Sequence, residues 1–83
     1  MYKLRLRPRA EKELASLPVK DRKKVSSALS NLEINPFLGK KLHGEYEGLY
    51  SLRVWPYRIV YTIIKQELLI IVIRVGHRQG VYK

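Results

Sequence analysis

Two arginines in the C-terminal half of this 83-residue chain have the type and the spacing that suit the binding of an anion. If a tight turn is centred on Trp55-Pro56, Arg53 on the strand before it lies directly opposite Arg58 on the strand after it. Like charges paired across strands destabilise a sheet, whereas two convergent guanidiniums bind a phosphate well. The pair therefore predicts a phosphate site. The alternative is that each guanidinium extends past a sheet edge into water.

The last residues of the chain, RVGHRQGVYK, bring three further side-chain types together. They are the imidazole of His77, the guanidinium of Arg78 and the phenol of Tyr82. Because an unperturbed histidine changes its charge near neutral pH, His77 is suited to acid or base catalysis, or else it is a structural residue at the strand end. A solvated chain terminus is the alternative interpretation of the whole segment.

The register of the last hairpin decides which of these side chains joins the arginine pair. With a two-residue turn, Val75 opposes Arg58 and His77 falls on the arginine face. With a three-residue turn, or with a bulge at Gly76, Arg78 takes that face instead. In both registers we expect the end of the chain to form the third wall of a basic cavity.

The composition restricts the other possibilities. The length is that of one domain, residues 1–83, and hydrophobic residues at 46% suffice for its core. The chain has no cysteine and only two histidines, His43 and His77, so we expect neither a metal ion nor another cofactor. No apolar run is long enough to span a membrane and no signal peptide precedes the first strand, so we expect a soluble cytoplasmic protein.

The formal net charge of +10 is the strongest global signal. Such an excess repels itself and attracts polyanions. Nucleic acid is the commonest partner of this kind, followed by an acidic protein and an anionic membrane, and a merely solvated basic surface is the remaining alternative.

The N-terminal half has the pattern of a strand followed by two helices. Residues 1–7 alternate strictly between apolar and other side chains and predict a strand with one basic face. Apolar side chains at helical spacing predict amphipathic helices over 10–17 and 19–34, with Pro18 between them.

The C-terminal half has the pattern of a loop followed by three strands. Residues 35–48 contain a proline and three glycines and are predicted as a loop. Segments 49–54, 57–64 and 68–75 are predicted as an antiparallel meander. The order β-α-α-β-β-β predicts an α+β fold, a small antiparallel or mixed sheet with an N-terminal helical hairpin packed on one face.

The segments GLYSLRV, YRIVYTI and IVIRVGHRQGVY, preceded by NPFLGKKLHG and two helices, resemble the RelE/ParE superfamily of toxins, and more narrowly its RelE branch. The resemblance covers essentially the whole chain. It implies a RelE-like fold and the toxin of a type II toxin–antitoxin system. It also implies a ribosome-dependent endoribonuclease that cleaves messenger RNA, with a RelB-like antitoxin as its cognate partner.

The resemblance also assigns roles to residues. It places catalytic positions at Arg53, Arg58, Arg78 and Tyr82, while the role of His77 stays open. A basic residue that RelE carries two positions before Arg53 is Ser51 here, so one cation is missing.

Cleavage without a metal ion would begin with attack of a ribose 2′-hydroxyl on the adjacent phosphate. Arginines keep their charge at all relevant pH values, so they are expected to bind the phosphate and stabilise its transition state. Family precedent adds the role of acid for Arg78. Tyr82 would stack on a base or orient the hydroxyl, and its alternative is packing on the sheet.

Basic residues outside the cavity are expected to bind the phosphates of ribosomal RNA without reading its sequence. They are Lys3, Arg5, Arg7, Lys20, Arg22, Lys23, Lys24, Lys40 and Lys41.

Two alternatives to the enzyme stay open. One is a ParE-like or inactive member that acts by binding a protein, either its antitoxin or DNA gyrase, and the change at Ser51 favours it. The other is a general RNA-binding module without toxicity.

Overall fold

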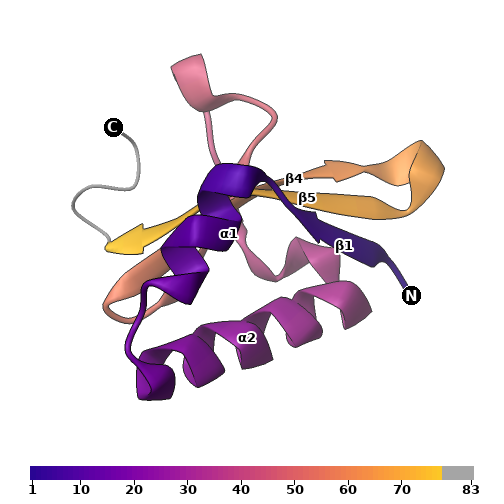
Figure 1. Ribbon diagram of the computed structural model, residues 1–83. Helices are drawn as coiled ribbons and strands as arrows, with labels where there is room; N and C mark the ends of the chain where they lie inside the picture. Colours follow the sequence, from indigo (N-terminus) through magenta and orange to yellow (C-terminus); the bar gives the residue numbers. More distant parts are fainter. Residues whose placement is uncertain (78–83) are drawn as a thin grey trace.

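Residues 1–77, the part of the chain that the computed structural model describes, form a mixed sheet with two helices against one face (Figure 1). In chain order the elements are β1 (Lys3–Leu6), α1 (Pro8–Ala15), α2 (Val19–Ile34), β2 (Lys40–Lys41), β3 (Tyr50–Val54), β4 (Tyr57–Ile64) and β5 (Leu69–His77). Short 3-10 turns lie at Pro36–Leu38, Gly44–Tyr46 and Lys65–Glu67.

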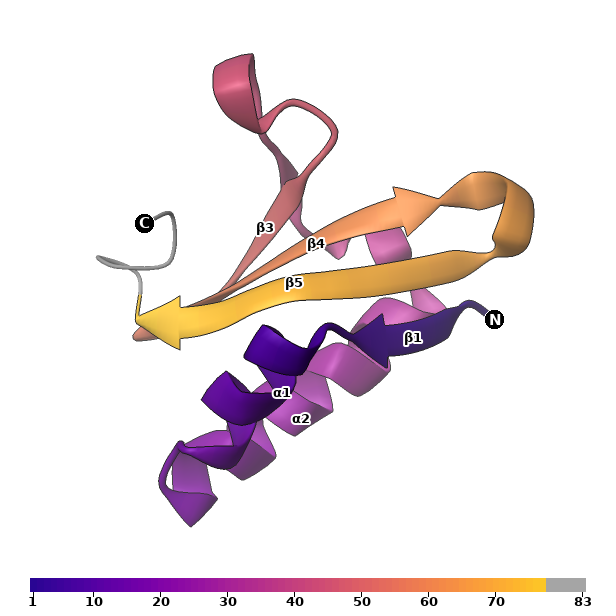
Figure 2. The ribbon, with the colours of Figure 1, turned by 45° about the horizontal axis from the view of Figure 1, so that its top comes forward.

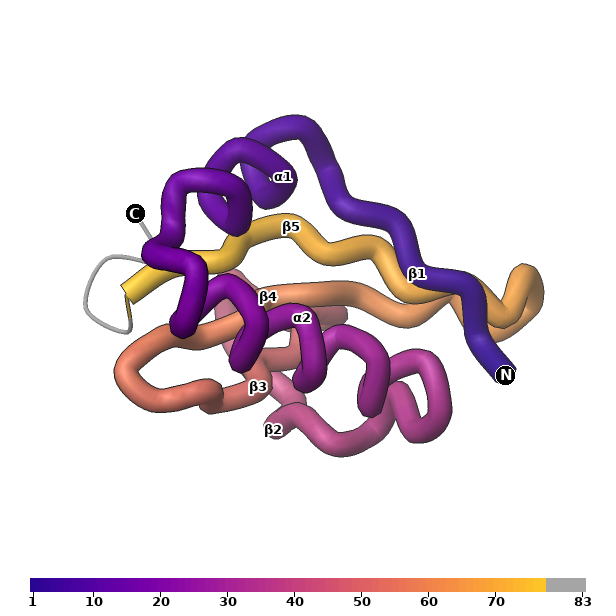
Figure 3. The backbone as a smooth tube through the Cα atoms, turned by 60° about the horizontal axis from the view of Figure 1, so that its bottom comes forward, coloured from indigo at the N-terminus to yellow at the C-terminus, as the bar shows by residue number. Residues whose placement is uncertain are grey.

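The strands of this described part are arranged in the order β1-β5-β4-β3-β2. β1 runs parallel to β5, and the other neighbouring strands are antiparallel. The predicted α+β class and order of elements are therefore confirmed. The loop predicted over residues 35–48 is wrong at Lys40–Lys41, which form β2 beside β3 (Figure 3).

Prolines mark the beginning of both helices. Pro8 lies in the first turn of α1, so this helix starts before residue 10, the predicted start, and it ends at Ala15. The fixed φ of proline suits a first helical turn, where its missing N–H leaves no hydrogen bond unmade. Pro18 is the N-cap of α2, whose observed bounds are the predicted ones.

The core lies between the two helices and one face of the sheet (Figure 2). The helices contribute Ala10, Val25, Leu29 and Leu32, and the strands contribute Ile59, Tyr61, Ile70, Val72 and Val75. Because side chains alternate across a strand, their neighbours along β3 and β4 point to the other face. We call this second face, on the side away from α1 and α2, the outer face.

A β-bulge changes the register of the last hairpin. Tyr61 pairs with Val72, but Val60 pairs with Arg74, which leaves Ile73 as the extra residue on β5. From the bulge onward, each side chain of β5 lies on the face opposite to the one that an unbroken strand would give it. The bulge thus decides which C-terminal residues share the outer face.

Glu13 of α1 occupies the edge of β5 just after this bulge. Its carboxylate accepts hydrogen bonds from the backbone N–H of Val75 at 2.9 Å and from Nε of Arg74 at 2.9 Å. A second guanidinium nitrogen of Arg74 lies 2.9 Å from the same carboxylate. β1 pairs with β5 only as far as Val72, so Glu13 supplies a partner for β5 where β1 has ended.

Within residues 1–77, neither helix combines the length and the apolar character that crossing a membrane requires.

Candidate phosphate-binding site

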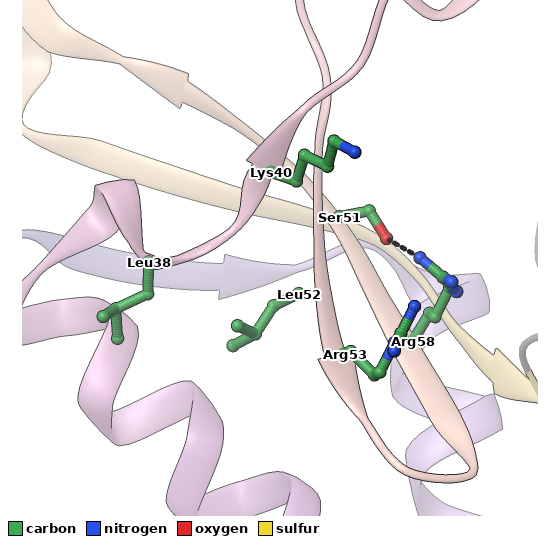
Figure 4. A pocket seen from close by; sticks show the side chains of 6 residues that line it. All are labelled: Leu38, Lys40, Ser51, Leu52, Arg53 and Arg58. Carbon is green, nitrogen blue, oxygen red and sulfur yellow. Dashed lines mark hydrogen bonds between the residues drawn. The ribbon is translucent and has the colours of Figure 1, made fainter.

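Four polar side chains from three neighbouring strands share the outer face at the β3–β4 hairpin. Arg53 pairs directly with Arg58, as predicted, and Lys40 pairs with Ser51 on the other side of β3. Since Ser51 and Arg53 are two positions apart on one strand, all four residues lie on the same face. Figure 4 shows their polar groups on one side of β3, with Leu52 extending away from them.

These residues line a shallow hollow of about 350 Å³, which we call the basic hollow. Its lining consists of Leu38, Lys40, Ser51, Leu52, Arg53 and Arg58. Small-molecule sites occupy about 300–1,000 Å³, so the volume of the hollow lies at the lower end of that range.

The guanidinium of Arg58 is held by a buried hydroxyl. Its Nη1 donates a hydrogen bond of 3.3 Å to Oγ of Ser51, which is 4% exposed. Among residues 1–77, the carboxylate that forms ion pairs is that of Glu13, and neither Arg53 nor Arg58 forms one. The two like charges therefore face each other without a neutralising carboxylate in the described part of the chain, and an anion between them would relieve their repulsion.

Helix α2 fixes the turn that carries the arginines. The amine of Lys24 donates a hydrogen bond of 2.7 Å to the backbone oxygen of Trp55, whose peptide bond with Pro56 is cis. The hydroxyl of Tyr57 donates one of 2.7 Å to Oδ2 of Asp21, and this bond raises the pKa of Tyr57. The turn between β3 and β4 is therefore anchored to α2 at Trp55 and at Tyr57, on both sides of Pro56.

His77 lies on the face of Tyr57 and not on that of the arginines. It pairs with Tyr57, and their rings meet edge to face with centroids 6.4 Å apart. The residue opposite Arg58 is Gly76, so the register with Val75 in that place is wrong. The alternative register, from a three-residue turn or a bulge at Gly76, left His77 off the arginine face, and this is the observed arrangement, although the extra residue is Ile73.

Arg78 and Tyr82 lie outside the described residues.

The basic residues predicted to bind ribosomal RNA are spread over several elements. Lys3 and Arg5 are exposed on β1, and Arg7 is the N-cap residue of α1. Lys20, Arg22, Lys23 and Lys24 lie in the first turns of α2. Two of these four have structural partners, because Arg22 donates to the backbone oxygen of Ala15 and Lys24 to that of Trp55.

The sequence pattern does not separate the two lysines of β2. Lys41 pairs with Tyr50 and so has the opposite orientation to Lys40, which lines the basic hollow. A signal was present in the alternation of faces along a strand, but a two-residue strand inside a glycine-rich segment is too short to reveal it.

Among residues 1–77, no group of three or more His, Cys, Asp or Glu side chains is arranged so that it could hold a metal ion.

Comparison with known proteins identifies relatives of the whole chain. Residues 4–82 match the family model described as the ParE toxin of the type II toxin–antitoxin system parDE. Toxin RelG of Mycobacterium tuberculosis is 31% identical over 84 residues, which cover 99% of this chain and 97% of that protein.

Solved structures match the fold over nearly the same extent. The toxin–antitoxin complex RelBE2 of M. tuberculosis contains a chain that is 32% identical, with a TM-score of 0.86 over 93% of this chain and 98% of that one. The isolated RelE toxin of E. coli is 29% identical, with a TM-score of 0.82 over 93% of this chain and 84% of that one.

Proposed function

Because the chain belongs to the ParE toxin family of type II toxin–antitoxin systems, within the RelE/ParE superfamily, we propose that it is a ribosome-dependent endoribonuclease that cleaves messenger RNA. One observation carries this proposal: Arg53 and Arg58 face each other on the outer face without a carboxylate between them in residues 1–77. Two like charges paired across strands destabilise the sheet by themselves. A phosphodiester bound between the two guanidiniums would offset this repulsion and so explain the pair.

The proposed reaction needs three changes at the scissile bond. The ribose 2′-hydroxyl loses its proton and its oxygen attacks the adjacent phosphorus. The bond from phosphorus to the 5′-oxygen breaks, and this oxygen takes up a proton, which leaves a 2′,3′-cyclic phosphate. Negative charge grows on the phosphoryl oxygens in between, where the guanidiniums of Arg53 and Arg58 would stabilise it.

The proton transfers require groups other than this pair, since a guanidinium with a pKa above about 12 is a poor base. Family precedent assigns the acid to Arg78, and Tyr82 would orient the attacking hydroxyl or stack on a base. The strand that precedes Arg78 supports this assignment, because Gly76, two positions before Arg78 in the sequence, lies opposite Arg58. His77 faces Tyr57, so we assign it to the support of the hairpin rather than to proton transfer.

We further propose a RelB-like antitoxin as the cognate partner. The structural relative from M. tuberculosis is a toxin–antitoxin complex, which supports a partner of this kind. The net charge of +10 favours an acidic antitoxin, because its binding would relieve the self-repulsion of the toxin.

A second function is favoured by the name of the matched family, which is that of ParE toxins. Such a toxin would act on DNA gyrase by binding it, and the basic hollow would then bind an acidic protein segment. Ser51, in place of a basic residue, fits this alternative as well.

Induced expression in bacteria distinguishes the two functions. We expect translation to stop and messages to be cut within their coding regions, as read by mapping of RNA 5′ ends, while Arg58→Ala removes the cuts. Blocked replication with intact messages would overturn the endoribonuclease and support the gyrase alternative.

A further inference from the structure

The basic hollow contains a third cation, Lys40, which comes from a strand that the sequence pattern does not reveal. We infer that the amine of Lys40 binds the same phosphate as Arg53 and Arg58, and so supplies the positive charge that Ser51 lacks. This inference rests on the proposed function for its biological meaning, but phosphate binding by Lys40 can be tested separately.

Strand pairing places Lys40 beside Ser51 on the outer face. The two residues are direct partners in the antiparallel ladder between β2 and β3. Side chains of such partners stand next to each other on one face, about 5 Å apart at their Cβ atoms. A lysine at position 40 therefore brings its amine to the region that a basic residue at position 51 would reach.

The small side chain of Ser51 leaves that space to Lys40. Its hydroxyl is directed at Arg58, from which it accepts a hydrogen bond of 3.3 Å. Figure 4 shows the Lys40 amine and the Arg58 guanidinium on the same side of β3, with Ser51 between them. The serine thus orients one cation while its cross-strand neighbour supplies another.

The backbone before Lys40 is held in place from the core side. The N–H of Gly39 donates a hydrogen bond of 2.9 Å to the hydroxyl of Tyr61, which donates one of 2.7 Å to the backbone oxygen of Pro36. A Cβ at Gly39 would lie 2.5 Å from that hydroxyl and 3.0 Å from the backbone oxygen of Ser51. Only glycine allows this close approach, and it brings β2 into the sheet with Lys40 directed at the hollow.

Lys41 provides a matched control. It is the same residue type, adjacent in sequence and also exposed, but it pairs with Tyr50 and lies on the other face. Lys40→Ala and Lys41→Ala therefore change the net charge equally and differ only in which face loses a cation.

The first test compares the single-turnover cleavage of messenger RNA on programmed ribosomes by these variants. We expect Lys40→Ala to lower the rate constant by about tenfold or more, toward the effect of losing one transition-state donor. At saturating ribosome concentration, where a weaker contact of Lys41 with ribosomal RNA does not affect the rate constant, we expect Lys41→Ala to stay within about threefold of the wild type, because its charge lies away from the site. Equal losses in both variants would overturn the inference.

Relocation of the cation makes the test sharper. In the Lys40→Ala background, Ser51→Lys should restore most of the lost rate, because it returns an amine to the same region of the hollow. The same Ser51→Lys change in the Lys41→Ala background should give no such gain. Thermal unfolding of each variant verifies folding, and Lys40→Arg, which leaves Ser51 in place, should keep at least half of the wild-type rate.

A binding measurement separates this inference from the proposed function. The probe is a short RNA with 2′-O-methyl groups, which cannot be cleaved by 2′-hydroxyl attack, titrated into the isolated protein and followed by amide NMR. We expect shifts at residues 51–53 and 58, and a dissociation constant that Lys40→Ala raises more than Lys41→Ala does. If the wild type cuts no message, the proposed function fails, while this titration still decides the role of Lys40.

Discussion

At the scale of single residues, the proposed function gives Arg53 and Arg58 opposite effects on stability and on activity. They are direct cross-strand partners of like charge, and only Arg58 has a hydrogen bond to a buried hydroxyl. Arrangements that disfavour folding persist where a ligand benefits from them. The pair should therefore give opposite signs in measurements of stability and of activity.

We predict these opposite signs for Arg53→Ala. Removal of one like charge should raise the free energy of unfolding by about 0.2–1 kcal/mol. Loss of one donor to the phosphate should lower single-turnover cleavage about 100-fold. Urea denaturation and ribosome-programmed cleavage measure the two quantities. A variant that is less stable and fully active would show that the pair is structural.

Tyr57 offers a second prediction at this scale, because its hydrogen bond to Asp21 raises its pKa above the ordinary value of 10.0. The folded protein then keeps the phenolic proton more firmly than the unfolded chain. Stabilisation by this bond is present below the unfolded-state pKa and is lost as the pH rises through the folded-state pKa. We expect the stability advantage of the wild type over Tyr57→Phe to decline above about pH 10.

Urea denaturation of both proteins across pH 8 to about 11 measures this advantage. The comparison with Tyr57→Phe removes effects that both proteins share, such as the loss of lysine charge in the same range. Parallel stability curves would contradict the role of the Tyr57–Asp21 hydrogen bond.

At the scale of elements, Glu13 joins α1 to the bulged part of β5. Its carboxylate accepts hydrogen bonds from the N–H of Val75 and from Arg74, and its side chain is 23% exposed. Hydrogen bonds that involve a charged group contribute about 1.5–3 kcal/mol each. We predict that Glu13→Ala lowers the free energy of unfolding by about 2–3 kcal/mol.

The exposed Glu11 on the same helix provides the control. Glu11→Ala should change stability by less than about 0.5 kcal/mol. The amide of Val75 should exchange faster with solvent in Glu13→Ala but not in Glu11→Ala. Unchanged protection at Val75 would show that the hydrogen bond to Glu13 does not hold this edge.

Elements that have a long apolar pattern and a proline just before them could be predicted from the sequence. Helix α2 and strand β4 have their predicted bounds, because each presents a long apolar pattern and a proline precedes it. Strand β2 could not be predicted, since two residues have no measurable period and its pairing depends on the approach of Gly39 to Tyr61. The bulge at Ile73 depends on where β1 ends beside β5, which is a property of the folded sheet.

The same distinction applies to the site. The pairing of Arg53 with Arg58 follows from a short local turn, and it was predicted. The place of Lys40 depends on a strand from a glycine-rich segment and could not be predicted. The position of His77 depends on the bulge at Ile73, so the sequence left two registers open, and only the alternative one keeps His77 off the arginine face.

At the scale of the whole molecule, the net charge of +10 should dominate the proposed binding to the ribosome. Each phosphate that a lysine or arginine neutralises releases its condensed counterions, so the affinity falls steeply as the salt concentration rises. We predict that the logarithm of the association constant declines linearly with the logarithm of salt concentration. Arg5→Ala should reduce the slope by about 0.7–0.9, the value for one phosphate contact.

Filter binding to 70S ribosomes between about 50 and 300 mM salt gives these slopes. Arg22→Ala is the contrasting variant, because the guanidinium of Arg22 donates to the backbone oxygen of Ala15 and is already used within the fold. Its slope should stay closer to that of the wild type. An affinity that does not depend on salt would contradict a binding mode based on phosphates.

The central claim is that the basic hollow holds the scissile phosphate, and a structure of the ribosome-bound protein tests it most directly. The ribosome would carry a message with a 2′-O-methyl group at the cleavage position, so that the complex persists. We predict non-bridging oxygens of the scissile phosphate within about 3 Å of the guanidinium nitrogens of both Arg53 and Arg58. A message bound elsewhere, with the hollow empty or facing solvent, would contradict the account.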